Sequence, residues 1–143
     1  MNGQGRPLPS EEHEAYWLTT LPRDVSARPE DREHSGKWLV FVRKERIDEV
    51  WEVLRAETEA GRLGCRSKVS TSARNPDQVV LDERDGVICV FTYDHRDRAD
   101  VRRVRARLRE LGFRERLAYK TNRATREGRY GEPSDLSVHE LYE

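Results

Sequence analysis

Three lysines, Lys37, Lys68 and Lys120, lie in segments whose residue types are typical of β-strands. Arg66 precedes Lys68 by two residues, so both side chains point to the same face of their strand. Arginine offers a planar fork of donors to phosphate oxygens, and lysine offers a compact charge. Neighbouring strands in one sheet would turn these cations into an anion site. The alternative is a set of unrelated, solvent-exposed side chains.

Further groups could extend such a site. Arg126 and Arg129 would join the cations if the basic segment 123–131 folds back across the sheet. A lysine crowded by other cations can lose its proton near neutral pH and act as a general base. His95 follows an apolar segment directly and is the histidine expected near the sheet, the alternative being an exposed loop position. The sequence shows no Ser/His/Asp arrangement, phosphate-binding glycine loop or metal-ligand spacing, so we predict neither a cofactor nor a metal.

The elements that position these residues follow from hydrophobic patterns. Residues 37–42 are typical of a strand, and residues 87–93 are almost entirely apolar, which predicts a central strand covered on both faces. Residues 65–71 and 117–121 are predicted to be the strands that carry Lys68 and Lys120. Residues 79–81 are predicted to be a short edge strand, and Asp85-Gly86 to be a hairpin turn.

Two helices are predicted between the strands. The first has an apolar stripe of Ile47, Val50, Trp51 and Leu54 and ends at Gly61. The second begins after Asp97, a suitable N-cap, and ends at Gly112. Its other face carries arginines, which we predict to be solvated rather than to bind RNA because no aromatic residue is interleaved with them. They are Arg102, Arg103, Arg105, Arg107 and Arg109.

Length and composition indicate one domain. The 143 residues carry 27 basic and 27 acidic side chains, so no overall charge favours a polyanion. We predict a disordered segment 1–13, a single α+β domain over residues 14–131 and a C-terminal tail over 132–143. Within the domain, residues 14–35 form an arm and linker, in which residues 14–18 could form a helical turn.

The two cysteines, Cys65 and Cys89, match no zinc spacing and are predicted to be buried side chains in a reducing compartment. No apolar run approaches the length that crosses a bilayer. We therefore expect a cytoplasmic protein without membrane contact.

Several motifs together resemble the family of the basophilic-leukaemia-expressed protein, over about residues 14–131. The resemblance implies a fold like that of the cap-binding translation initiation factor 4E: a curved, mainly antiparallel sheet with two main helices on one face. Pattern alone would also fit a ferredoxin-like split β-α-β. The matching segments are Ser67-Lys68-Val69-Ser70-Thr71, Tyr119-Lys120-Thr121 and residues 35–39, 48–51, 64, 87–94, 100–104 and 111–112.

The same order of motifs is similar to that of the phosphothreonine lyases secreted by bacterial pathogens and of the lyase domains of lanthipeptide synthetases. Those enzymes remove phosphate from phosphothreonine or phosphoserine by β-elimination, without metal. The similarity implies that Lys68 is the catalytic base and that Lys37 holds phosphate. It also places Tyr119-Lys120, with Arg126 or Arg129, at a second phosphate-binding position. The lyases have a histidine acid two residues after the first-strand lysine, where this chain has Leu39.

The leading hypothesis is therefore a phosphothreonine lyase-like protein acting on a phosphorylated peptide. Lys68 would be the base, and His95 or another group would replace the missing acid. Lys37, Arg66, Lys120, Arg126 and Arg129 would bind phosphate. Loss of general-acid help costs ~10²–10⁴-fold in rate, which leaves room for weak activity.

Two alternatives remain open. The first is a non-catalytic module that binds phosphate, a nucleotide or RNA, in which Trp17 and Trp38 would stack on a base. The second is an interaction domain whose cationic face contacts an acidic partner.

Overall fold

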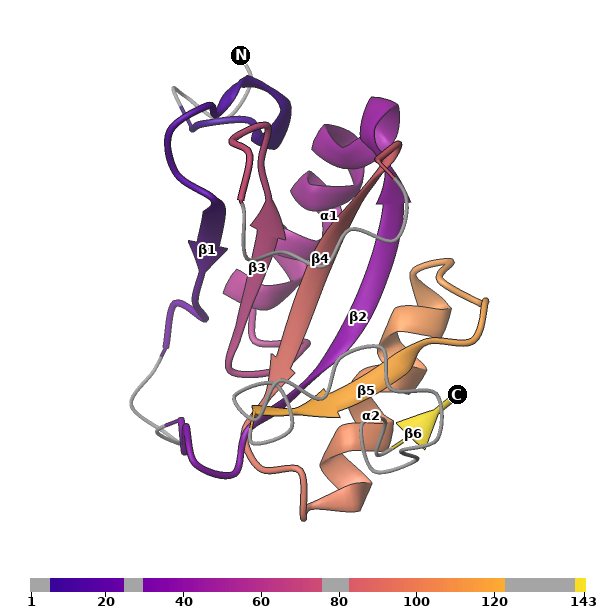
Figure 1. Ribbon diagram of the computed structural model, residues 1–143. Helices are drawn as coiled ribbons and strands as arrows, with labels where there is room; N and C mark the ends of the chain where they lie inside the picture. The colour runs from indigo at the N-terminus through magenta and orange to yellow at the C-terminus, as the bar shows by residue number, and fades with distance from the viewer. Residues whose placement is uncertain (1–5, 25–29, 76–82, 123–140) are drawn as a thin grey trace.

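The computed structural model describes residues 6–24, 30–75, 83–122 and 141–143, and it shows an α+β fold built on one antiparallel sheet (Figure 1). The sheet has six strands in the order β1-β3-β4-β2-β5-β6. The predicted fold class is confirmed, and the topology is compatible with an initiation-factor-4E-like arrangement. The strands are β1 (Trp17–Thr20), β2 (Gly36–Arg43), β3 (Arg66–Ser70), β4 (Asp85–Thr92), β5 (Ala118–Thr121) and β6 (Leu141–Tyr142).

Both helices cover the same face of the sheet, α1 (Ile47–Glu59) behind β3 and β4 and α2 (Arg98–Glu110) behind β5 (Figure 1). Their predicted apolar stripes pack against Trp38, Val90 and Tyr119 in the larger hydrophobic core. The predicted ends are also confirmed. The Asp97 carboxylate accepts a hydrogen bond from the backbone N–H of Asp100, and Gly61 and Gly112 end the helices with positive φ. Among the described residues, neither helix has the length or the apolar composition that a membrane span requires.

The centre of the sheet is the pair β2 and β4. All eight residues of β2 have a partner on β4, from Gly36 opposite Thr92 to Arg43 opposite Asp85. Residues 86–92 are all buried, which confirms the predicted central strand. The turn predicted at Asp85-Gly86 is wrong, because both residues belong to β4 and pair with the end of β2. The strand predicted at residues 79–81 lies outside the described residues.

The N-terminal arm differs from the prediction. Residues 14–18 do not form a helical turn, because Trp17–Thr20 is a strand that pairs antiparallel with the otherwise open edge of β3. The β-favouring residues Trp17, Thr19 and Thr20 suit that position. The described part of the segment predicted to be disordered is also ordered. Pro9 is buried, and both the backbone N–H and the hydroxyl of Ser10 donate to the Asp48 carboxylate of α1. Within the predicted tail, β6 pairs with β5.

One arginine of α2 corrects the predicted solvated face. Arg102, Arg103 and Arg109 are exposed as expected, but Arg105 is only 1% exposed. Its guanidinium donates to the carbonyl oxygens of Phe113, Glu115 and Glu143 at 2.8, 2.6 and 2.7 Å. Arg105 therefore ties α2 to the segment before β5 and to the residue after β6. The position of Arg105 in the helical pattern could not predict these contacts, because the three acceptors are backbone atoms.

We predict that Arg105→Leu lowers the free energy of unfolding by about 2–5 kcal/mol, because it leaves buried carbonyl groups without donors. Urea titration would measure the change. Arg109→Leu removes an exposed arginine from the same helix and should change stability by no more than about 0.5 kcal/mol. Equal effects of the two substitutions would contradict a structural role for Arg105.

Candidate functional site

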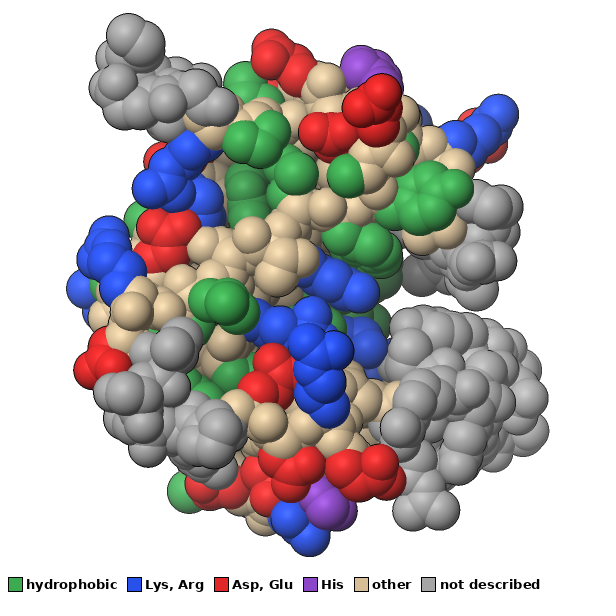
Figure 2. Space-filling model, turned by 90° about the vertical axis from the view of Figure 1, so that its left-hand side faces the viewer, with side chains coloured by type: hydrophobic (Ala, Val, Ile, Leu, Met, Phe, Trp, Pro, Cys, Tyr) green, Lys and Arg blue, Asp and Glu red, His purple; other side chains and the backbone are tan. Residues whose placement is uncertain are grey.

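The sheet face opposite the helices carries three of the predicted phosphate-binding cations and the predicted base, Lys68. Lys37 lies opposite Lys120 on one side and Phe91 on the other, and Phe91 lies opposite Arg66. A single row of side chains thus crosses β5, β2, β4 and β3. We call this surface, made of Lys37, Arg66, Lys68, Lys120 and the rings of Phe91 and Trp17, the cationic face. Figure 2, which views the molecule from the side of β1, shows lysine and arginine side chains gathered near the middle.

Lys68 belongs to the next row. It lies opposite Cys89, which lies opposite Leu39. The Lys68 Nζ atom is 4.0 Å from the centroid of the Trp17 ring, which β1 supplies from the sheet edge. Sequence reasoning placed Trp17 in a helical turn, so it missed this contact.

The Phe91 ring is the common neighbour of three cations. The guanidinium carbon of Arg66 is 3.7 Å from its centroid, and the Nζ atoms of Lys37 and Lys68 are at 5.4 and 5.7 Å. An aromatic ring attracts cations through its quadrupole, by ~0.5–2 kcal/mol each according to their desolvation. Phe91 therefore lowers the repulsion cost of bringing like charges together. Phe91 was not predicted as a site residue. The signal that could have identified it is its spacing of two residues from Cys89, which places both side chains on the same face of the strand.

Burial makes the lysines unusually acidic. Lys37 and Lys120 are both 5% exposed, and desolvation lowers the pKa of each to about 8. For Lys37, the positive charges of Lys68, Lys120 and Arg66 lower the pKa further. Desolvation, aided by Arg66, also lowers the pKa of Lys68. These lysines can therefore exchange protons closer to neutral pH than ordinary surface lysines do.

A carboxylate of the chain already contacts this face. Glu30, in the segment before β2, pairs with Arg66 at 3.1 Å between its Oε1 atom and Nε. Both side chains are largely shielded, at 16% and 18% exposure. Glu30 thus holds a position at Arg66 that an external anion would also favour.

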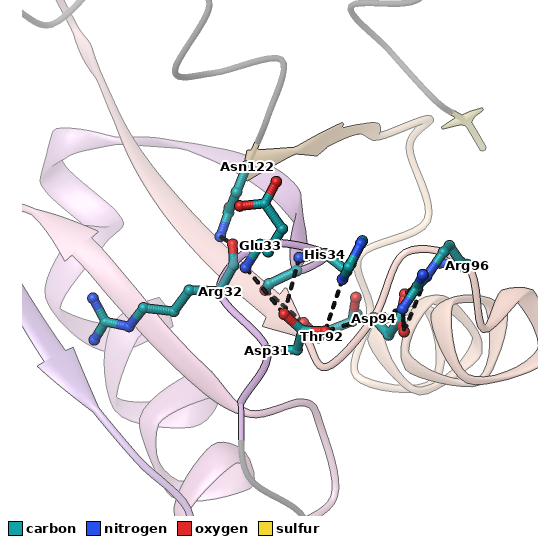
Figure 3. A network of polar contacts seen from close by, with 9 residues as sticks. Asp31, Arg32, Glu33, His34, Thr92, Asp94, Arg96 and Asn122 are labelled. Carbon is teal, nitrogen blue, oxygen red and sulfur yellow. Dashed lines mark hydrogen bonds and ion pairs between the residues drawn. The ribbon is translucent and has the colours of Figure 1, made fainter.

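His95 lies in the loop beyond the end of β4. Its backbone N–H donates to the carbonyl of His34 at 2.7 Å, and the two rings are 6.2 Å apart. Figure 3 shows the polar network around His34, in which its Nδ1 atom bonds to Asp31 and Arg96 pairs with Asp94. His95 therefore helps to join the segment before β2 to the loop after β4. Its role as an acid stays a prediction.

Other predicted residues fall elsewhere. Arg126 and Arg129 lie outside the described residues. Trp38 is fully buried, and its Nε1–H donates to the Val101 carbonyl, so it cannot stack on a base. Cys65 and Cys89 are buried free thiols as predicted, and burial raises the pKa of both, to about 12 for Cys65.

The fold and this face define an α+β protein with a desolvated cluster of cations on the sheet face opposite the helices. The model of one family, described as basophilic leukemia-expressed protein Bles03, matches residues 25–124. The chain belongs to this family, as the resemblance predicted. No curated protein matches the chain. The match spans β2, β3, β4 and β5, the strands that supply all four cations.

We predict that Lys37→Met raises the free energy of unfolding by about 1–3 kcal/mol at pH 7, because it removes a desolvated charge. The folded pKa of about 8 lies below the ordinary 10.5, so the unfolded chain binds more protons between these values. The Lys37 penalty is therefore complete below pH 8 and fades as the pH rises towards 10.5.

Urea titrations from pH 7 to pH 10 would test this. The advantage of Lys37→Met over the wild type should shrink as the pH rises. Lys44→Met, at an exposed lysine, is the matched control and should have little effect. A variant less stable than the wild type at pH 7 would show that Lys37 contributes favourable contacts instead.

Proposed function

We propose that the cationic face binds the phosphate group of a phosphorylated peptide, and that Lys68 catalyses β-elimination of that phosphate. The supporting observation is that Lys37, Lys68, Lys120 and Arg66 meet on one face around Phe91. Like charges held together and desolvated cost stability, and a bound ligand of opposite charge would offset part of that cost. A phosphate group has the oxygens and the charge to engage several of them at once.

The chemistry requires a base for the proton on the α-carbon of phosphothreonine or phosphoserine. Lys68 would take this proton on Nζ, the C–H electrons would form the Cα=Cβ double bond, and the Cβ–O bond would break. Phosphate would leave with the bonding electrons, its charge balanced by Lys37, Lys120 and Arg66. The products are a dehydroamino acid and inorganic phosphate. Lys68 is suited to the task because burial and Arg66 lower its pKa.

The leaving phosphate also needs a proton. Leu39, in the lyase histidine position, is buried beside Cys89 and cannot supply one. The Lys37 ammonium group, with a pKa of about 8, is charged at pH 7 and more acidic than an ordinary lysine. We propose that Lys37 delivers this proton. The reaction then requires Lys68 to be neutral and Lys37 to be protonated in the same molecule. Activity should then be low but measurable, and it should fall as the pH rises above about 8, where Lys37 loses its proton.

We expect incubation with a phosphothreonine peptide to yield a product lighter by one phosphoric acid, which mass spectrometry would detect. Lys68→Arg keeps the charge but removes a usable base, so it should reduce the rate by ~10²-fold or more. Lys44→Met should leave the rate unchanged. A product carrying threonine would indicate hydrolysis and contradict the elimination. Binding without any product would support the non-catalytic alternative.

One observation favours that alternative as a second candidate. Trp17 is half-buried at the rim of the cationic face, with Lys68 over its ring. A nucleotide could place its phosphate on the lysines and its base against this ring. Of the two tryptophans predicted to stack on a base, Trp38 is buried, so only Trp17 could stack on it, from one side. A nucleotide is therefore the second candidate ligand, after the phosphopeptide.

We predict that Glu30→Gln tightens the binding of inorganic phosphate by about 3- to 10-fold, because Arg66 then loses its internal carboxylate partner. Calorimetric titration at pH 7 would measure the affinity. In the wild type the affinity should fall as the pH rises through about 8, where Lys37 and Lys120 lose their charge. Glu110→Gln, at an exposed ion pair of α2, is the control. An unchanged or weaker affinity in Glu30→Gln would show that Glu30 does not compete for the anion.

A further inference from the structure

Among the described residues, one edge of β2 is paired along only half of its length. On one side β2 pairs with β4 along its whole length, but on the other β5 pairs only with Gly36–Leu39. Within the described part of the chain, residues 40–43 have no strand on that side. An open strand edge presents backbone donors and acceptors to any extended chain that can reach it.

The direction of the backbone groups follows from the hydrogen bonds at both ends of β2. Asn122 donates to the Ser35 carbonyl, so odd-numbered residues bond towards β5. Lys44 donates to the Arg84 carbonyl, so even-numbered residues bond towards β4. Antiparallel ladders alternate in this way. The N–H and C=O of Phe41 therefore point to the uncovered edge.

A groove of about 500 Å³ runs along this edge, between α1 and the segment that follows α2. Phe41 and Val53 are 47% and 44% exposed, high values for large apolar side chains. Three of its four charged lining residues form ion pairs, Arg46 with Glu49 at 2.9 Å and Arg43 with Asp85 at 3.3 Å. The fourth, Glu115, is exposed. The groove thus offers apolar contact and backbone hydrogen bonds, with most of its charged side chains engaged in ion pairs within the chain. Its apolar lining is Phe41, Val42, Val50, Val53, Leu111 and Phe113.

We propose that this groove binds an extended, uncharged peptide segment of a partner protein, which adds to β2 as a short strand in line with β5. Main-chain hydrogen bonds to Phe41 would give affinity, and apolar side chains at alternate peptide positions would fill the groove. Four residues of open edge span about 13 Å, enough for a strand of four or five residues.

A single strand fits this site better than a second copy of the chain. Stable protein–protein interfaces bury ~1,200–2,000 Å² in total, far more than a four-residue edge provides. The walls formed by α1 and by residues 111–115 also restrict the approach of a folded domain. The peptide-binding proposal is independent of the phosphate-binding proposal, because no residue of the cationic face lines the groove.

A peptide selection tests the proposal. A library of ten-residue peptides displayed on phage would be selected on the full wild-type chain and counter-selected on Val53→Arg, which introduces a charge in the groove. Leu21→Arg is the matched control, because Leu21 is 51% exposed just after β1 at the other edge of the sheet. Selected peptides should have alternating apolar residues, should bind Leu21→Arg at least 10-fold more tightly than Val53→Arg, and should not be displaced by inorganic phosphate.

N-methylation of the selected peptide then tests the strand pairing itself. Methylation of the peptide N–H that faces Phe41 should abolish binding, and methylation of its neighbours should be tolerated. Failure to enrich any peptide against Val53→Arg would overturn the proposal, as would equal sensitivity at all positions. A dimer of the wild type that Val53→Arg dissociates, measured by light scattering, would assign the edge to a second copy instead.

Discussion

The antiparallel pairing of β2 with β4 is the constraint on which the other features depend. Because the register fixes Lys37 opposite Phe91, it also fixes which side chains meet on the cationic face. A slip of one residue would carry Lys37 to the helix-covered face and Trp38 to the open one. The core prevents this slip, since Trp38, Val40 and Val90 are almost fully buried beneath the helices. Hydrophobic packing on one face thus sets the electrostatics of the other.

The two faces of the sheet handle positive charge in different ways. On the helical side, Arg105 donates hydrogen bonds to three carbonyl oxygens, which offset part of the cost of its burial. On the cationic face, the contacts described include the aromatic ring of Phe91 beside Arg66 and the ion pair of Arg66 with Glu30. Arg105 therefore has a structural role, whereas the lysines of the cationic face are the residues for which we propose ligand binding. This contrast is also the reason that the lysines, and not the arginines of α2, carry the functional proposal.

Periodicity was sufficient to predict the helices, the central strand and the shared face of Arg66 and Lys68, because these depend on neighbouring residues in the chain. The contacts between distant segments could not be predicted in the same way. Trp17 reaches Lys68 only because β1 completes the edge of β3, and Glu30 reaches Arg66 from the segment before β2. Arg105 was predicted to be solvated, because its acceptors are backbone carbonyl groups and every residue has one, so the sequence carries no sign of the contact. The strand pattern and the similarity to the phosphothreonine lyases did assign Lys37 and Lys120 to one site, and the register places them side by side.

The position of β2 in the sheet has a consequence for how the molecule forms. This strand comes early in the sequence, but its neighbours β4 and β5 follow only after long intervening segments. The pairing of Lys37 with Lys120 closes a loop of more than eighty residues. Such non-local contacts form late and slowly compared with helices. Assembly of the cationic row therefore reports that the whole sheet has folded, so a partly folded chain would present the separate strands without the combined charge that could retain a ligand.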